Sequence, residues 1–415
     1  MMDLIQRFAP LDRVPVCMGT RLLTNHVADL MQADVREVAS GTRCLDWTIP
    51  NEWSVNRGVL STVAGDVIAD YEDHPLSIWS CCGSFSGEMD LKQLREHLYF
   101  LPSSPSAIPF HYRCCYDQHC LDDWGFSLPE KVAKELKDVR YIVDIDTEHK
   151  SGSMCYIDHE IPGEKPDTIL FSAHTCHPGQ VNDGIANVAV LVELFKWIRS
   201  EPRKFTYRFI IGPEYYTAAA VLEHRRSIDK VLGGFYLDLA GANTGLAWSR
   251  TSSGNSWIDH LLQSVASDYS IEVRESGYRG VIGNDEMFYD GPGFNIPVAP
   301  VCREVPPEYH TSDDNIQSCS DSRLTEMLDF LMNTIMTAES ETLPRLNVQG
   351  PVCLSRRRIS ILPSSPVWGR QSTQLAMKMM DGRHSISQIA HESGLPLKAV
   401  TLFVEELVSS GVLDC

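Results

Sequence analysis

Four short apolar runs between residues 168 and 302 form the clearest pattern in the chain. They span 168–173, 207–212, 231–237 and 296–302, and helical patterns such as that of residues 188–197 separate the first three. Continuous apolar runs that alternate with helices are typical of parallel strands that are buried on both faces. We therefore expect residues 130–340 to form an α/β domain with a mixed sheet.

The residues before these runs divide into two kinds of pattern. Residues 22–35 have apolar side chains at helical spacing, and the alternating runs 140–146 and 154–159 flank a glycine-containing turn, which predicts a hairpin. Residues 41–128 are instead rich in aromatic residues, proline, glycine and cysteine, with short alternating pieces and one helical piece at 91–98. We assign residues 1–40 and 129–345 to the main domain and 41–128 to an inserted, mostly β module.

Residues 350–415 form a third unit. Two helical patterns flank the turn Ser-Gly-Leu-Pro, and Gly-Val-Leu follows the second, which predicts a winged helix-turn-helix. Such motifs often bind DNA, but the second helix offers only Lys398 as a cation and carries Glu405 and Glu406. We therefore favour packing or protein contact over DNA binding.

Composition and charge narrow the function classes. The 415 residues have a formal net charge of −19 and form no dense basic block, so nucleic acid is not an expected partner. There is no run of eighteen apolar residues and no apolar signal core near the start, which predicts a cytoplasmic protein without a membrane segment. The 13 cysteines are scattered and odd in number, so we expect reduced thiols.

Polar residues that can bind a metal or a substrate follow each apolar run. They are His174, His177 and Asp183 after the first run, Glu214 after the second, Asp238 after the third, and Arg303 and His310 after the last. The carboxyl ends of strands in an open α/β sheet meet at one edge, where ligands bind. Imidazole and carboxylate are zinc ligands, and the clustered acids would repel one another without a cation. The pattern predicts a zinc site.

Each of these residues also has a structural interpretation. Asp238 is a candidate helix cap, Glu214 a candidate solvated loop acid, and His310 a candidate for backbone bonds in a turn. His174 and His177 are equally compatible with two unrelated histidines of a polar turn.

The order of these motifs resembles the zinc aminopeptidase family M28. The whole chain is most similar to a bacterial subgroup of DUF4910/DUF2172-type aminopeptidase-like proteins with a small inserted domain and a C-terminal winged helix. The phrases that carry the resemblance are Asp46-Trp-Thr-Ile-Pro-Asn-Glu-Trp53, His74-Pro-Leu76, Trp124-Gly-Phe126, Ser172-Ala-His-Thr-Cys-His-Pro178 and Pro307-Glu-Tyr-His-Thr-Ser312. The resemblance implies a three-layer αβα fold of the zinc-exopeptidase type.

The resemblance also implies roles for individual residues. It makes His174 and Asp238 ligands of one zinc, His310 a ligand of a second, and Asp183 the carboxylate that bridges the two. The acidic pair of the family, a general base followed by a ligand, falls here on Glu214 and a tyrosine, Tyr215.

Two departures from the family pattern affect the metal count. Tyr215 does not readily replace a carboxylate, so Glu214 is either the base or a ligand. Cys176 stands where the family has the acid that orients its histidine. His177 is a candidate replacement ligand beside Asp183 and His310, and we therefore favour one zinc over two, with Glu214 as the base.

These expectations describe a zinc-dependent amide hydrolase of aminopeptidase type, acting on a small peptide or an aminoacyl-modified metabolite. Tyr215 or Tyr216 is a candidate donor to the oxyanion, with ordinary packing as the alternative. Asp285 is a candidate partner of a substrate ammonium, and Arg303 of a substrate carboxylate, with a structural ion pair as the alternative.

Two other functions remain open from the sequence: a catalytically inactive scaffold that binds a partner, and a DNA-binding regulator. The inserted module and the C-terminal unit both offer surfaces for self-association, which is compatible with a homo-oligomer, and the sequence leaves the oligomeric state open.

Overall fold

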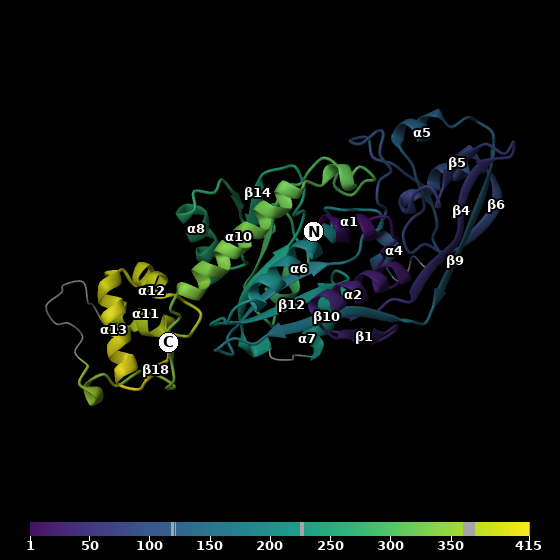
Figure 1. Cartoon of the computed structure of the whole chain (residues 1–415). Helices are drawn as coiled ribbons and strands as arrows, with labels where there is room; N and C mark the ends of the chain where they lie inside the picture. The colour runs from purple at the N-terminus through teal and green to yellow at the C-terminus, as the bar shows by residue number, and fades with distance from the viewer. Residues whose placement is uncertain (118–119, 121, 225–227, 360–369, 415) are drawn as a thin grey trace.

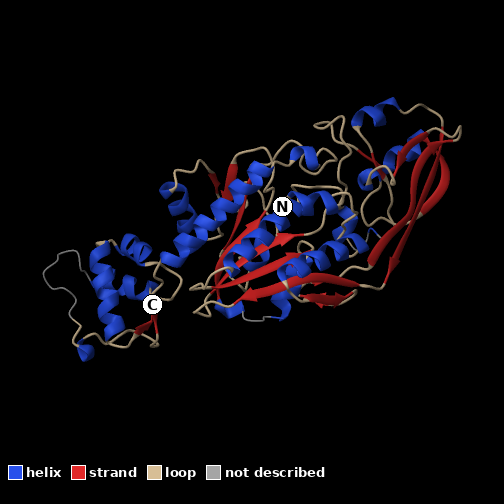
Figure 2. Cartoon of the chain, viewed as in Figure 1, coloured by secondary structure: helices blue, strands red, loops and turns tan. Residues whose placement is uncertain are grey.

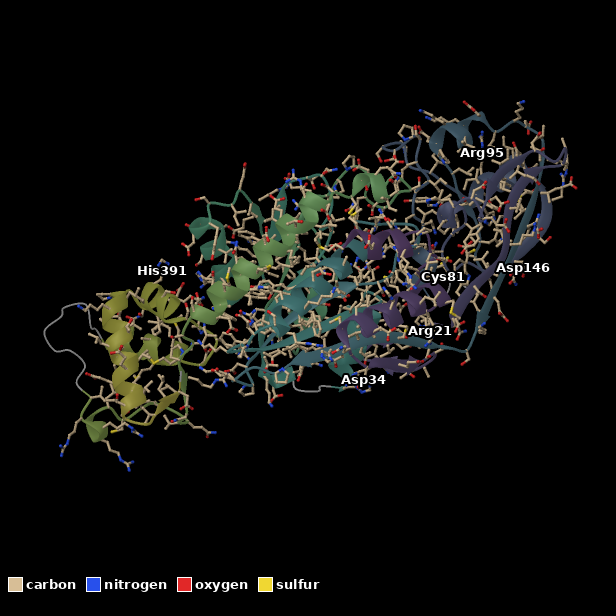
Figure 3. All side chains as sticks on the ribbon, viewed as in Figure 1. Arg21, Asp34, Cys81, Arg95, Asp146 and His391 are labelled. Atoms are coloured by element: carbon tan, nitrogen blue, oxygen red, sulfur yellow. The ribbon has the colours of Figure 1, made fainter. Side chains whose placement is uncertain are left out.

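The computed structural model of the chain describes residues 1–117, 120, 122–224, 228–359 and 370–414. Within these residues, an eight-stranded sheet occupies the middle of an elongated molecule, with a four-stranded sheet at one end and a group of helices at the other (Figures 1 and 2). Figure 3 labels a residue at each end of the molecule: Asp146 lies in the four-stranded sheet, and His391 lies among the C-terminal helices.

The eight-stranded sheet is mixed. In spatial order its strands are β1 (Val35–Ala39), β10 (Ser153–Ile161), β12 (Thr206–Gly212), β11 (Thr168–His174), β13 (Val231–Leu237), β16 (Val298–Arg303), β14 (Leu246–Ser249) and β15 (Arg274–Ser276). The four neighbouring strands β12, β11, β13 and β16 are parallel to one another. β10 is antiparallel to both β1 and β12, and β14 is antiparallel to β16. The mixed sheet and the four strands predicted from the apolar runs are confirmed.

Helices cover both faces of this sheet. Phe171 and Phe209 face one side, which is covered by α1 (Met2–Phe8), α2 (Met18–Met31), α6 (Ile185–Arg199), α8 (Trp257–Asp268) and α10 (Asp321–Ser340). Leu170 and Ile210 face the other side, which is covered by α7 (Tyr216–His224) and α9 (Glu286–Tyr289). The expected three-layer αβα architecture is therefore confirmed. In the described part of the chain, no helix combines the length and apolar character needed to cross a bilayer.

The early helix is confirmed with a shift in its bounds. α2 ends at Met31, before the predicted end at residue 35, because Gln32 adopts a left-handed conformation with φ 54° that closes the helix. The chain then enters β1 at Val35.

The small sheet corrects one prediction. Its strands, in order, are β5 (Val67–Asp70), β4 (Glu52–Thr62), β9 (Arg140–Lys150) and β6 (Phe85–Asp90), all antiparallel. The hairpin predicted for 140–159 is wrong, because β9 pairs with β4 and β6 whereas β10 pairs with β1 and β12 in the large sheet. Each of the two strands thus pairs with strands that are distant in sequence and not with the other. The small sheet extends to Lys150, beyond the expected module boundary at 128.

Short elements complete the inserted module and its flanks. They are β2 (Arg43–Cys44), β3 (Trp47–Thr48), α3 (Leu91–Leu94), β7 (Leu98–Tyr99), α4 (Arg113–Tyr116), β8 (Phe126–Ser127) and α5 (Glu130–Glu135). The helix predicted at 91–98 is limited to α3 and a 3-10 turn over Arg95–His97.

The C-terminal unit has its own small core. It contains α11 (Arg370–Met379), α12 (Ile386–Ser393), α13 (Leu397–Ser409) and a two-stranded sheet of β17 (Arg345–Leu346) and β18 (Leu413–Asp414). Gly394, at φ 66°, ends α12 in the left-handed conformation that glycine adopts without strain. The winged-helix assignment stays a prediction, and part of it, residues 360–369 and 415, lies outside the described residues.

Candidate metal centre

The carboxyl ends of three neighbouring parallel strands meet where the sequence predicts the site. His174 ends β11, Glu214 follows β12 by two residues, and Asp238 follows β13 directly. His177 and Asp183 lie in the loop between β11 and α6. The loop after β16 brings His310 to the same place, so the backbone topology collects residues from across 136 positions of sequence.

Asp183 is the centre of the group and belongs to two triads. His310 Nε2 lies 2.9 Å from Asp183 Oδ2, and His177 Nε2 lies 4.0 Å from the same oxygen. His174 Nε2 lies 3.1 Å from Asp183 Oδ1 and 3.7 Å from Asp238 Oδ1. In each triad, one possible ligand atom per residue falls within 4.8 Å of the others. The structure therefore brings all five predicted ligands together.

Burial and charge in this group fit a divalent cation. Burial raises the pKa of Asp238 to about 6 and lowers the pKa of His177 to about 4, which keeps that imidazole neutral, as a metal ligand must be. Burial opposes the protonation of His174, but the carboxylates of Asp183 and Asp238 raise its pKa well above 6.5. Asp183 Oδ2 and Asp238 Oδ2 are buried and accept no hydrogen bond, so each triad contains an acceptor without the partner that a cation would supply.

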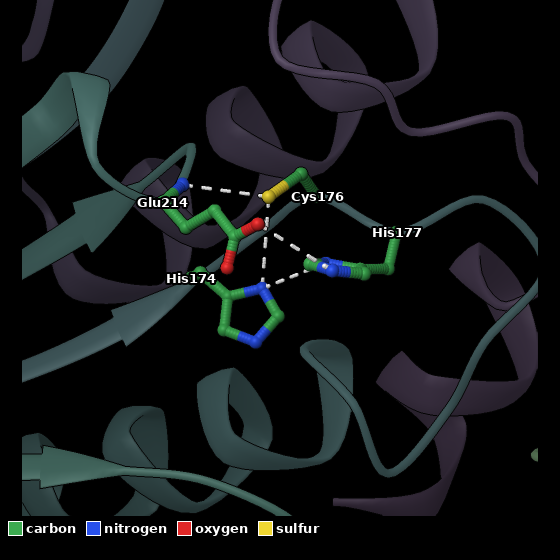
Figure 4. A group of neighbouring side chains, drawn as sticks. All are labelled: His174, Cys176, His177 and Glu214. Atoms are coloured by element: carbon green, nitrogen blue, oxygen red, sulfur yellow. Dashed lines mark hydrogen bonds and ion pairs between the residues drawn. The ribbon is translucent and has the colours of Figure 1, made fainter. Parts of the chain in front are cut away.

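The histidine rings limit how the two triads can be used. His174 Nδ1 lies 3.2 Å from His177 Nδ1, and a dashed line marks this contact between the two rings in Figure 4. The raised pKa of His174 favours a charged ring that donates through Nδ1 to His177 as long as no cation is bound. A bound cation would displace that extra proton; each neutral imidazole then carries one proton, so one ring donates through Nδ1 and the other accepts. The donating ring keeps a lone pair on Nε2 for a metal, whereas the accepting ring carries its proton there. Only one of His174 and His177 can therefore offer an Nε2 lone pair to a metal at a time, so only one triad at a time has all its ligands.

Cys176 lies beside His174, at the position where the family resemblance implies an orienting acid. Its Sγ lies 3.6 Å from His174 Nδ1 and accepts the backbone N–H of Glu214 at 3.4 Å. The thiol thus connects the ends of β11 and β12, and burial raises its pKa to about 11.

Two buried side chains that the sequence analysis did not select hold the ligand loop. Arg13 donates to the carbonyl groups of His177 and Gln180, at 2.9 and 2.5 Å. Asp314 accepts the backbone N–H of Asp183 at 2.9 Å. No periodic pattern indicates a site role for Arg13. Asp314 lies four residues after the predicted ligand His310, and this closeness in sequence could have identified it as a candidate site residue.

Glu214 has a donor on each carboxylate oxygen. The hydroxyl of Tyr116 donates to Oε1, and Asn284 Nδ2 donates to Oε2 at 2.5 Å. Glu214 Oε1 also lies 3.6 Å from His177 Nε2. The carboxylate therefore stands beside the His177 triad. Tyr116 belongs to the inserted module and was not recognised as a site residue from the sequence.

Tyr215 and Asp285 contact each other through the backbone. The Tyr215 N–H donates to Asp285 Oδ1 at 2.5 Å, and the Tyr215 ring packs on Trp47. Asp285 is buried, and this burial raises its pKa to about 8. Its carboxyl group accepts the backbone N–H of Tyr215 in this buried environment. The Tyr216 hydroxyl donates to the Cys115 carbonyl at 2.7 Å, which engages it in a structural bond. The oxyanion role stays a prediction for Tyr215, as does the ammonium role of Asp285.

Arg303 makes its hydrogen bonds to groups other than the five candidate metal ligands. Its fully buried guanidinium donates to the carbonyls of Ala240, Thr244 and Arg323 and to Glu326 Oε2. This geometry matches the structural ion pair that the sequence analysis gave as the alternative.

Comparison with known proteins places the chain in a family of unknown function. The family described as domain of unknown function DUF4910 matches residues 2–341. A relative from Clostridium acetobutylicum is 27% identical over 98% of this chain and 94% of its own length. That protein is provisionally named a polysaccharide biosynthesis protein with an aminopeptidase-like domain.

Solved structures share the fold. A protein from Clostridium acetobutylicum, provisionally called a peptidase, superposes with a TM-score of 0.77 at 26% identity, covering 99% of this chain and 95% of that one. The zinc aminopeptidase BSAP of Bacillus subtilis gives 0.58 at 14% identity, covering 81% and 94%. A peptidase M28 precursor of Shewanella amazonensis gives 0.57 at 12% identity, covering 82% and 93%. The resemblance to M28 aminopeptidases that the motifs indicate is therefore confirmed for the fold.

Proposed function

The chain belongs to the DUF4910 family, and we propose that it is a zinc-dependent amide hydrolase of aminopeptidase type. The observation that carries this proposal is the convergence of buried imidazoles and carboxylates around Asp183, with Glu214 beside them. The proposed substrate is a small peptide or an aminoacyl-modified metabolite. The name of the Clostridium relative, which joins polysaccharide biosynthesis to an aminopeptidase-like domain, favours an amide substrate of this kind.

We assign one zinc ion to His177, Asp183 and His310. In this assignment His177 donates through Nδ1 to His174, and His174 Nε2 lies 3.1 Å from Asp183 Oδ1 without a hydrogen bond in this structure. His174 then lies against the shared carboxylate instead of binding the ion. A zinc ion bound here supplies Lewis acidity, which acidifies a water molecule and polarises the scissile carbonyl.

Glu214 is the general base of the proposed reaction. Its Oε1 is 3.6 Å from the ligand nitrogen of His177, so the carboxylate can take a proton from water at the centre and deliver it to the leaving amine. Glu214 belongs to neither triad that contains Asp183, although it could share an ion with His174, Cys176 and His177. We assign it the role of base because its Oε1 lies beside the proposed Asp183 site. Tyr215 is the proposed donor to the oxyanion, with packing against Trp47 as the alternative.

The test combines metal analysis with an amide assay. Purified protein should contain one zinc per chain and cleave an amino-acid amide or dipeptide, and a chelator should abolish that activity. Glu214→Gln should keep zinc while kcat falls about 100- to 10,000-fold, because the base is lost and the ligands remain. Glu193→Gln, on the exposed side of α6, is the matched control and should keep full activity.

An inactive scaffold is the second candidate. The observation in its favour is Tyr215, which stands where the family pattern has its second acid and whose ring packs on Trp47. A scaffold predicts no amide turnover by the wild type and identical behaviour of Glu214→Gln. Chelator-sensitive turnover that Glu214→Gln removes would exclude it.

A further inference from the structure

We infer that Tyr116, on α4 of the inserted module, positions the Glu214 carboxylate for proton transfer, so that the insert completes the catalytic site. This inference rests on the proposed hydrolase function. Tyr116 and Glu214 are 98 positions apart in sequence, and their contact joins the module to the end of β12.

The contact fixes the plane of the carboxylate. Tyr116 donates to Oε1 and Asn284 donates to Oε2, so each oxygen accepts one hydrogen bond. A carboxylate oxygen has two lone pairs, and each oxygen of Glu214 therefore keeps one for a proton from water. Two donors on opposite oxygens restrain rotation of the group, which a single donor would allow.

Tyr116 is itself held in place. Its ring stacks on Tyr216 with centroids 6.0 Å apart and meets the edge of Tyr215 at 5.4 Å. The Tyr216 hydroxyl bonds the carbonyl of Cys115, the residue before Tyr116, and so anchors α4 to α7. Burial and the nearby Glu214 carboxylate raise the pKa of Tyr116 well above 10, which keeps its hydroxyl a donor. The restraint on Glu214 is therefore rigid.

Loss of the hydroxyl should reduce the rate more than substrate binding. With only Asn284 left, the Glu214 carboxylate samples orientations that do not face the water, and catalysis by a positioned group depends steeply on geometry. Tyr116→Phe keeps the ring and its stacking. We expect a 10- to 100-fold fall in kcat, a KM within about twofold of the wild type and an unchanged zinc content.

The control is Tyr141→Phe. Tyr141 lies on β9 of the small sheet and donates its hydroxyl to the Lys137 carbonyl at 2.7 Å. This variant also loses a buried tyrosine hydrogen bond near the module, but not one to Glu214. It should keep kcat. An equal loss of kcat in both variants would overturn the positioning role and indicate a general effect on stability.

A double-mutant cycle tests whether Tyr116 acts through Glu214. In a Glu214→Ala background, Tyr116→Phe should cause no further loss, because the group that it positions is absent. Multiplicative losses would overturn the inference.

A crystal structure of Tyr116→Phe separates this inference from the proposed function. Glu214 should leave its wild-type position or occupy several orientations, and an unmoved Glu214 would overturn the positioning role whatever the activity. Absence of chelator-sensitive turnover in the wild type would instead refute the proposed hydrolase.

Discussion

Asp314 holds the turn that carries the proposed ligand Asp183 through hydrogen bonds to its backbone. Its carboxylate accepts the N–H groups of Asn182 and Asp183, each at 2.9 Å, and it is 1% exposed. Since Asp183 belongs to both triads, the turn that Asp314 fixes sets the position of the carboxylate they share. Loss of a group that orients a metal ligand typically lowers metal affinity about 10- to 100-fold.

Asp314→Asn should therefore weaken zinc binding without removing a ligand. An amide nitrogen replaces one acceptor oxygen, so one backbone N–H of the turn loses its partner and faces another donor. We expect zinc affinity to fall about 10- to 100-fold in a competition titration with a chromophoric chelator. Asp313→Asn changes the exposed neighbour and should retain wild-type affinity. Equal affinities in the two variants would show that the turn does not depend on Asp314.

At the scale of the elements, the sequence predicts where the strands lie, but it predicts only some of the pairings between strands. The apolar run at 168–173 becomes β11 because a fully buried strand needs apolar residues on both faces, which is a local property. The partners of β9 depend on β4 and β6, which lie 50 or more residues earlier in the chain. Local alternation therefore located β9 but gave it the wrong neighbour.

The same distinction separates the site residues. His174, Glu214 and Asp238 follow strand ends, so the topology of a parallel sheet predicts that they meet. Tyr116 lies on a four-residue helix of the insert, where nothing in the local sequence indicates contact with Glu214. Its contribution depends on how the insert packs against the main domain, which a single sequence does not specify.

The start of α6 depends on Gly184. This residue is the N-cap of the helix and has φ 123°, a conformation that side chains of L-residues rarely adopt. A Cβ atom there would lie 2.7 Å from the Cys176 carbonyl oxygen and 3.2 Å from His174 Cε1. The absence of a side chain thus lets the helix start directly against the ligand loop.

Gly184→Ala should lower both stability and zinc affinity. The strained φ costs about 1–3 kcal/mol, and the clash with the Cys176 carbonyl displaces the loop that carries the ligands. Gly65→Ala provides the comparison, because Gly65 also has a positive φ, 95°, but has nothing within 4 Å of its Cβ position. Chemical denaturation and zinc titration of both variants measure the two effects. A normal zinc affinity in Gly184→Ala would rule out the steric explanation.

At the scale of the whole molecule, the candidate metal ligands are gathered at one edge of the eight-stranded sheet. Asp183 and Asp238 are each 1% exposed at the end of the eight-stranded sheet, in a chain with net charge −19. Buried carboxylates without a cation repel one another and lose hydration. A bound cation removes both costs in the folded state only, so zinc should stabilise the main domain.

Zinc should therefore raise the temperature at which the main domain unfolds. At a free concentration 100 times the dissociation constant, a ligand that binds only the folded state contributes about 2.7 kcal/mol, which corresponds to a shift of several degrees. Differential scanning calorimetry of chelator-treated and zinc-reloaded protein measures this shift. His310→Ala removes a ligand of the proposed site and should abolish it. His384→Ala changes a histidine of the C-terminal unit that pairs with Asp381, so its zinc-dependent shift should match the wild type. An equal shift in His310→Ala and the wild type would place the stabilising ion at other ligands.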